Sequence, residues 1–310
     1  MRTELTGATR RNASLIRSLL GMGALLTLGA CVKPSLRGDV REVRTLANAP
    51  LLPAVPPGHV DELEPREIDQ LLAKPIDADQ AVRIALLHNR ELRARLRELG
   101  VERGQLMQAA LIANPSVEAE LSPERDSRVE LRAEYDVMSW VMAPMRKRAA
   151  QHDLDAARLS VAGDVVELGF QVRSAFYALQ AATQQLRVAQ GTLEALAAGR
   201  DAAVALLEAG NLRALDAASQ ISAFERARIS VAKLELGAAE RREQLQRLLG
   251  LYGAATAWTL ASVELAPLPE APATLDNLEQ RALRANLDLL ATRSRLEAIA
   301  KRTGIARTEG

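Results

Sequence analysis

The stretch from Met145 to Ala266 contains no proline, and it constrains the fold more than any other feature of the sequence. Apolar residues in its first half follow two tracks of seven-residue spacing. One track comprises Val161, Leu168, Ala175, Ala182, Ala189 and Leu196, and the other Val165, Val172, Leu179, Leu186 and Leu193. The tracks interleave in the coiled-coil pattern. We therefore expect a helix over 144–209, about 100 Å long, a turn at Gly210-Asn211, and an antiparallel returning helix over 214–250.

The composition agrees with long helices. Aromatic residues make up only 3% of the 310 residues, while Ala, Leu, Arg and Glu are abundant. Such a mixture favours coiled coils over a compact enzyme core. The formal net charge of +1 gives no indication of a nucleic-acid binder. The chain is therefore expected to be mainly α.

Two short segments break the helical pattern. "NPSVEAEL" (114–121) and "RVELRAEYDV" (128–137) alternate apolar and polar residues, and the polar loop "SPERDS" joins them. Alternation of this kind across a short loop predicts a β-hairpin, here over 115–137. Its charged face would carry Glu118, Glu120, Arg128, Glu130, Arg132, Glu134 and Asp136.

The apolar face of this hairpin has no evident partner among the other segments. In a membrane β-barrel, apolar residues face lipid and polar residues face a water-filled lumen. Tyr135 and Trp140 are suited to the headgroup level. Because one hairpin cannot close a barrel, several chains must contribute strands. The alternative is a peripheral flap on a coiled coil.

The N-terminus has the pattern of a signal peptide over 1–30. Arginines precede a short apolar run, "LLGMGALLTL", which is too short to span a bilayer. The run ends in "LGAC", which resembles a bacterial lipobox and implies acylation of Cys31. Val32 at the next position resembles lipoproteins that are sent to the outer membrane. The proline-rich segment 31–75 is expected to be an extended tether from acylated Cys31.

A helix is expected from Asp77 or Asp79 to about Ala113, and its sequence recurs near the C-terminus. A shift from Asn89 to Asn286 also aligns several other identical pairs: Pro75 with Pro272, Asp79 with Asp276, Ala85 with Ala282, Leu86 with Leu283, Leu92 with Leu289, Ala94 with Ala291 and Leu99 with Leu296. This similarity predicts an internal repeat, with a first unit over 76–271 and the incomplete start of a second unit over 272–310.

The ordered set of segments resembles the TolC-type outer-membrane efflux proteins. "VRSAFYAL" (172–179) is similar to a run in that family's first long helix. "LLEAGNLRALDAASQISAFERAR" is similar to the turn between its helices, with Gly210 and Asp216 correctly spaced, and "LQRLLG" (245–250) is similar to the close of the returning helix.

This resemblance implies a homotrimer that forms a β-barrel in the outer-membrane lipid, continued by a periplasmic α-barrel tunnel. It implies passive export, coupled to an inner-membrane transporter through a periplasmic adaptor, with Gly210, Asn211 and Leu212 at the adaptor-facing tip. Each family member has two repeats, so the shorter second repeat here predicts a truncated, non-functional fragment. The alternative is a six-copy ring.

The sequence fits other classes of function less well than it fits export. No catalytic residue, metal site or cofactor is expected, because the three histidines are scattered and no phosphate-binding loop is present. A periplasmic adaptor lipoprotein would need β-rich flanks, and a structural coiled-coil lipoprotein does not explain the hairpin. The outer-membrane component of type I secretion is a further alternative.

Overall fold

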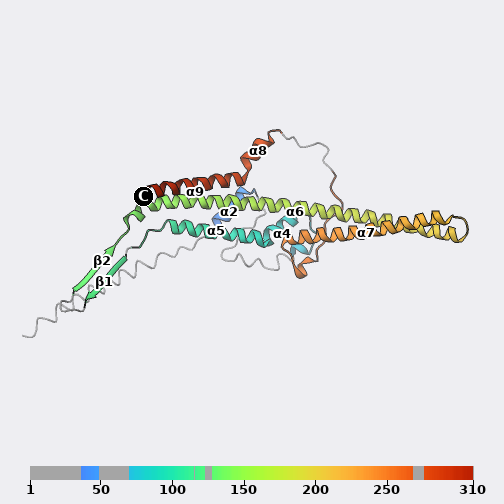
Figure 1. Cartoon of the computed structure of the whole chain (residues 1–310), viewed down its shortest axis with the longest axis horizontal. Coiled ribbons are helices and arrows are strands. Elements are labelled where there is room, and N and C mark those ends of the chain that lie inside the picture. The colour runs from blue at the N-terminus through green and yellow to red at the C-terminus, as the bar shows by residue number, and fades with distance from the viewer. Residues whose placement is uncertain (1–35, 49–69, 115, 123–127, 268–275, 310) are drawn as a thin grey trace, which may run out of the picture. The chain divides into compact units, whose positions relative to one another are not determined.

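The computed structural model describes residues 36–48, 70–114, 116–122, 128–267 and 276–309. The predicted signal peptide and acylation site Cys31 lie outside these residues, as does the hairpin loop at 123–127. The described residues are mostly helical, which confirms the predicted class (Figure 1). Among the described helices, none has the length and apolarity needed to cross a membrane.

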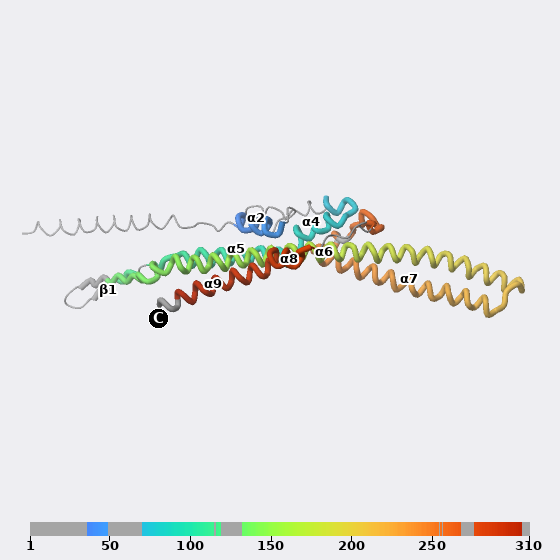
Figure 2. The backbone as a smooth tube through the Cα atoms, turned by 90° about the horizontal axis from the view of Figure 1, so that it is seen from above, coloured from blue at the N-terminus to red at the C-terminus, as the bar shows by residue number. Residues whose placement is uncertain are grey.

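The two longest helices are α6 (Val137–Glu208) and α7 (Ala214–Leu249), which pack against each other in antiparallel directions (Figures 1 and 2). The 72 residues of α6 correspond to about 108 Å. In its middle part, the track residues Val161, Val165, Leu168, Val172, Ala175 and Leu179 are all buried. The two tracks seen in the sequence therefore form the packed seam, and the long antiparallel pair is confirmed.

The start of α6 differs from the predicted boundary, because the helix begins before Pro144 and includes it. Asp136 caps the helix by accepting a hydrogen bond from the backbone N–H of Ser139 at 2.9 Å. Proline removes one backbone donor from the helix. Arg146, two residues after Pro144, reaches back and donates to the Ser139 carbonyl at 3.0 Å and to the Ser139 hydroxyl at 3.1 Å. The cap and this arginine support the helical turns that precede Pro144.

The helix expected from 77 to 113 is two helices, α4 (Ala78–His88) and α5 (Arg90–Ala109). Asn89 interrupts them and caps α5, since its Oδ1 accepts from the Leu92 N–H at 2.9 Å. Its Nδ2 donates to the Leu248 carbonyl of α7 at 3.0 Å. A tertiary hydrogen bond therefore fixes the break. The predicted start is correct: Asp77 forms a capping box with Gln80.

One part of the expected tether is a helix, α2 (Arg37–Leu46), which packs against α6. Val40 and Val43 are buried in the core, and Asp39 is fully buried. The prediction of an extended segment over 31–75 is wrong for these residues, because α2 buries an apolar stripe and one carboxylate. The prolines on which the prediction depended lie outside α2.

The core lies where α4 and α5 meet α6 and the end of α7. The segment after α7 joins it through the short helix η1 (Gly253–Thr256) and buried Trp258. Ile76 donates to the Thr259 carbonyl at 2.9 Å and accepts from the Ala261 N–H at 2.8 Å. This backbone pairing holds the start of α4 against the chain that follows α7.

The C-terminal segment forms α8 (Leu278–Ala285) and α9 (Leu287–Glu309). Asn286 separates them, and its Oδ1 accepts from the Leu289 N–H at 2.8 Å. Asn89 occupies the same place between α4 and α5, and it makes the same hydrogen bond. α9 packs along α6.

Candidate membrane hairpin and helix-turn tip

Strands β1 (Ser116–Ser122) and β2 (Arg128–Glu134) pair in antiparallel register within the segment expected to form a hairpin. The register sets Val117 opposite Ala133, Ala119 opposite Leu131 and Leu121 opposite Val129. Alternate positions of a strand share one face. These apolar positions therefore share a face, and the exposed fraction of Val117 is 68%.

The other face carries the charged positions that the sequence identified. Glu118 lies opposite Arg132, Ser116 opposite Glu134, Glu120 opposite Glu130 and Ser122 opposite Arg128. Glu118, Arg132 and Glu134 are exposed. One cross-strand pair therefore joins opposite charges and another joins like charges, and opposite-charge pairs are the stabilising ones.

Asp136 does not belong to this face. The strand ends at Glu134, and the Asp136 carboxylate caps α6. The alternation in the sequence continues past the strand, so pattern reasoning included one residue too many. The remaining six charged positions stay together on one face by register.

Exposed apolar residues surround the junction between β2 and α6. They are Tyr135, Val137, Met138, Trp140 and Val141. Sequence reasoning assigned Tyr135 and Trp140 to the headgroup level and Val137 to a strand, and it did not identify Val141. Of the two nearest methionines, Met138 is exposed and Met142 is buried. The junction thus continues the apolar surface of the hairpin.

The helix-turn tip has the geometry that a close reversal requires. Gly210 has φ +72°, its N–H bonds to the Leu207 carbonyl at 3.0 Å, and the Asn211 N–H bonds to the Leu206 carbonyl at 2.8 Å. This is a Schellman ending, in which glycine tolerates the left-handed conformation. Asn211 is exposed and Leu212 is half-buried.

Three exposed leucines flank the turn and were missed by sequence reasoning: Leu206, Leu207 and Leu215. Leu206 lies off both seven-residue tracks of α6, but Leu207 continues the track of Val165, so the tracks alone do not identify these exposed leucines. Below the tip, the Arg200 guanidinium lies 4.0 Å from the centre of the Phe224 ring and joins α6 to α7. The tip therefore exposes apolar side chains, and the Arg200–Phe224 contact holds its two helices together.

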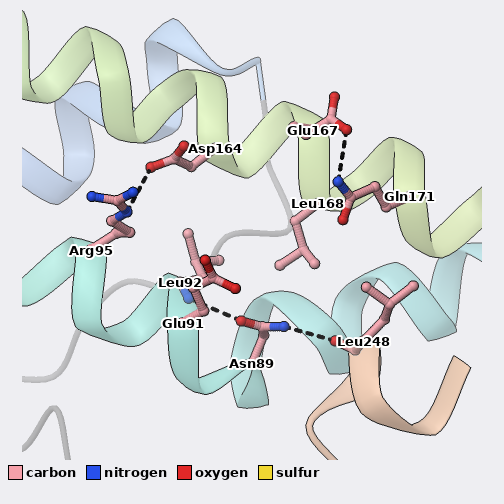
Figure 3. Close-up of a pocket in the computed structure, with 9 residues that line it drawn as sticks. All are labelled: Asn89, Glu91, Leu92, Arg95, Asp164, Glu167, Leu168, Gln171 and Leu248. Carbon is pink, nitrogen blue, oxygen red and sulfur yellow. Dashed lines mark hydrogen bonds and ion pairs between the residues drawn. The ribbon is translucent and has the colours of Figure 1, made fainter. Parts of the chain in front are cut away.

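A cavity of about 160 Å³ lies between α5, α6 and the end of α7 (Figure 3). Its polar groups bond to one another: Arg95 lies 3.5 Å from Asp164, Gln171 donates to Glu167 at 2.8 Å, and Asn89 donates to Leu248. Burial raises the pKa of Asp164, and Arg95 opposes that shift. We interpret this cavity as a packing gap between α5, α6 and α7 and not as a ligand site, because its polar groups already bond to one another.

Comparisons with known proteins define the class. The fold is that of bacterial outer-membrane channels. It matches CusC, whose structures concern transmembrane channel formation, with a TM-score of 0.59 and 20% identity over 75% of this chain and 56% of that one. It matches the outer-membrane channel OprN with a TM-score of 0.59 and 20% identity, over 74% of this chain and 55% of that one. VceC from Vibrio cholerae matches with a TM-score of 0.55 and 18% identity, over 74% and 58%.

A curated relative is the cobalt-zinc-cadmium resistance protein CzcC of Cupriavidus metallidurans. It is 27% identical over 243 residues, which cover 76% of this chain and 56% of that protein. The chain thus spans about half the length of the relative. No family model matches. The sequence and fold comparisons together confirm the resemblance to TolC-type outer-membrane efflux proteins.

Proposed function

We propose that this chain contributes to an outer-membrane channel of a tripartite efflux system, as a passive export conduit. The observation that carries the proposal is the hairpin, which has one apolar and one charged face and continues within two residues into α6. A barrel strand needs this division between lipid and lumen. The fold shared with outer-membrane channels supports the same assignment.

In this proposal the parts of the chain have separate roles. The apolar hairpin face contacts outer-membrane lipid, with Tyr135 and Trp140 at the headgroup level, and acylated Cys31 adds a lipid anchor after removal of the signal peptide. The six charged positions of the hairpin line the lumen. The tip at Gly210, Asn211 and Leu212 faces a periplasmic adaptor, which links the channel to an inner-membrane transporter. The functional assembly is a homotrimer, as in the family.

Two variants at neighbouring positions test the placement of the hairpin. In a Cys31→Ala background, Val117→Arg puts a charge on the lipid-facing side, and Glu118→Arg puts the same charge on the lumen-facing side. A charged side chain facing lipid near the bilayer midplane costs about 2–4 kcal/mol. We expect Val117→Arg to lose carbonate-resistant retention in outer membranes and Glu118→Arg to keep it. Equal retention of the two variants would contradict the proposal.

The charges of the hairpin suggest a substrate preference. Four glutamates and two arginines occupy the charged face, and the relative CzcC is named for cobalt, zinc and cadmium resistance. We therefore propose cations as the exported class. Conductance in planar bilayers should show mild cation selectivity, reduced by Glu118→Gln, and anion selectivity would refute the assignment.

A further inference from the structure

α5 and α9 occupy equivalent places in the internal repeat, yet they use different faces to contact α6. α9 buries Ala291, Ala298 and Ile305, which are seven residues apart. The shift from Asn286 to Asn89 maps them onto Ala94, Val101 and Gln108 of α5, and all three are exposed. We call these three α5 residues the outer face of α5.

The opposite face shows the reverse. α5 buries Leu92 and Leu99 in the core. Their identical counterparts in α9 are Leu289, which is half-buried, and Leu296, which is 60% exposed. The same residue types therefore serve as core in one copy and as surface in the other. This exchange shows that a helix of this type has two faces capable of packing.

The two helices lie at the same level of α6, along the same half of it (Figure 1). On the α5 side, Arg95 reaches Asp164. On the α9 side, a Cβ added at neighbouring Gly163 would lie 3.5 Å from the Asp288 carboxylate. Asp288 is the repeat counterpart of Glu91, and both carboxylates act on Asp164. α9 is thus placed as an α5-type helix on the second side of α6.

The second side of α6 is built for close approach. Ala149 and Ala156 are buried and, with Gly163, follow one another at seven-residue spacing. α9 is further fixed there by a hydrogen bond from Ser294 to the His152 carbonyl at 2.8 Å and by the Arg302–Asp153 ion pair. Small residues at this spacing accept the small and aliphatic residues of α9, and Ala94 and Val101 on the outer face of α5 are of the same kind.

We propose that α9 covers a surface of α6 that also fits the outer face of α5 from a second copy of this chain. While α9 is docked, copies do not join through this contact, and its release opens a head-to-tail contact between them. Such a contact repeats from copy to copy because its two surfaces differ. The inference rests on the internal repeat and is independent of the proposed channel function.

Cross-linking of the full chain tests the contact. The contacts Gly163–Asp288 and Asp153–Arg302 show that α9 runs antiparallel to α6, so we match Ala298, the middle buried residue of α9, with Ala156, the middle small residue of α6. The repeat assigns Val101 to the place of Ala298. Val101→Cys protein is mixed with Ala156→Cys protein, both in a Cys31→Ala background in detergent, and oxidised. With α9 docked, no linked peptide joining positions 101 and 156 should appear in mass spectrometry. When both proteins also carry Ala298→Glu, which places a charge in the buried contact, that peptide should appear.

Controls distinguish this contact from general association. Maleimide labelling of the Ala156→Cys side chain should rise when Ala298→Glu is added, which reports release of α9. If that variant loses its helical circular dichroism, Ile305→Glu replaces it and weakens the same contact from the other end. Val188→Cys lies on an exposed part of α6 far from α9 and should not link to position 101. Release of α9 without the 101–156 link, or equal linking to 188, would overturn the proposal.

Discussion

Replacement of Asp39 by asparagine should loosen α2 from the long helices. The Asp39 side chain is fully buried, and two arginines bind it. Arg103 of α5 donates to its two oxygens at 2.5 Å each, and Arg158 of α6 donates through Nε at 3.0 Å and Nη2 at 2.5 Å. One carboxylate thus joins three helices.

The expected cost follows from these contacts. Removal of one partner from a buried ion pair typically costs about 3–5 kcal/mol. Here Arg158 retains Glu42 and Asp155, each at 2.8 Å, and the Arg103 side chain is about one-quarter exposed. Both arginines therefore keep compensation, and we expect about 2–3 kcal/mol. Because 1.4 kcal/mol is tenfold in an equilibrium constant, exchange of α2 amides should accelerate about 30- to 150-fold.

Hydrogen exchange followed by mass spectrometry measures this directly at α2. Asp201→Asn is the matched control, because it removes a carboxylate from an exposed pair with Arg200, and such pairs contribute about 0–1 kcal/mol. Unchanged exchange in α2 of the Asp39→Asn variant, or an equal change in α2 of the control, would refute the reasoning.

The ion pairs of Asp39 with Arg103 and Arg158 should make the stability of α2 depend on pH. Burial alone raises the pKa of Asp39, but the hydrogen bonds and charges of Arg103 and Arg158 outweigh it and lower the pKa below 3.8. A lowered carboxyl pKa contributes stability that is present above the unfolded value and is lost as the pH falls through the folded value. Protection of α2 should therefore persist from neutral pH to about pH 4 and fall below it, and Asp39→Asn should remove this dependence.

Three further predictions concern the region around Asn89, where α4, α5 and the end of α7 meet. Gly250→Ala should lower the free energy of unfolding by about 2–4 kcal/mol, since Gly250 has φ +74° and a Cβ would lie 2.6 Å from the His88 carbonyl oxygen. Gly253→Ala is the control: φ is +62° there but no atom lies near the added Cβ, so the loss should be about 1 kcal/mol, and equal denaturation midpoints of the two variants would exclude the clash. Asn89→Ala should cost about 2 kcal/mol and Asn286→Ala about 1 kcal/mol, because only Asn89 also bonds Leu248; equal urea midpoints would contradict that bond. Burial and nearby Arg93 and Arg90 lower the pKa of His88, so stability should fall as the pH drops below about 6.5, and His88→Gln should flatten the urea midpoint between pH 7 and 5.

The sequence predicts those parts of the fold that local periodicity determines. The seven-residue tracks locate α6 and α7, and strict alternation locates the hairpin. The break at Asn89 could not be predicted in this way, because its side chain bonds to a carbonyl 159 positions away. The burial of α2 could not be predicted from local periodicity either, because Asp39 forms ion pairs with Arg103 of α5 and Arg158 of α6.

The candidate site follows the same division. The faces of the hairpin follow from alternation, whereas the end of β2 depends on a local competition that the pattern does not show. Asp136 continues the polar alternation of β2, but its carboxylate accepts a hydrogen bond from the Ser139 N–H and caps the start of α6. The exposed leucines at the tip became recognisable only when the packed seam was defined by burial.

The short connection between β2 and α6 has a mechanical consequence. Only Tyr135 and Asp136 separate the strand from the helix, and the helix then continues without interruption to Glu208. A rigid arm of about 108 Å converts a tilt of about one degree at its base into a displacement of about 2 Å at its far end. Small reorientations of the hairpin are therefore amplified into side-chain-sized movements at Gly210, and α6 acts as a lever between the two ends.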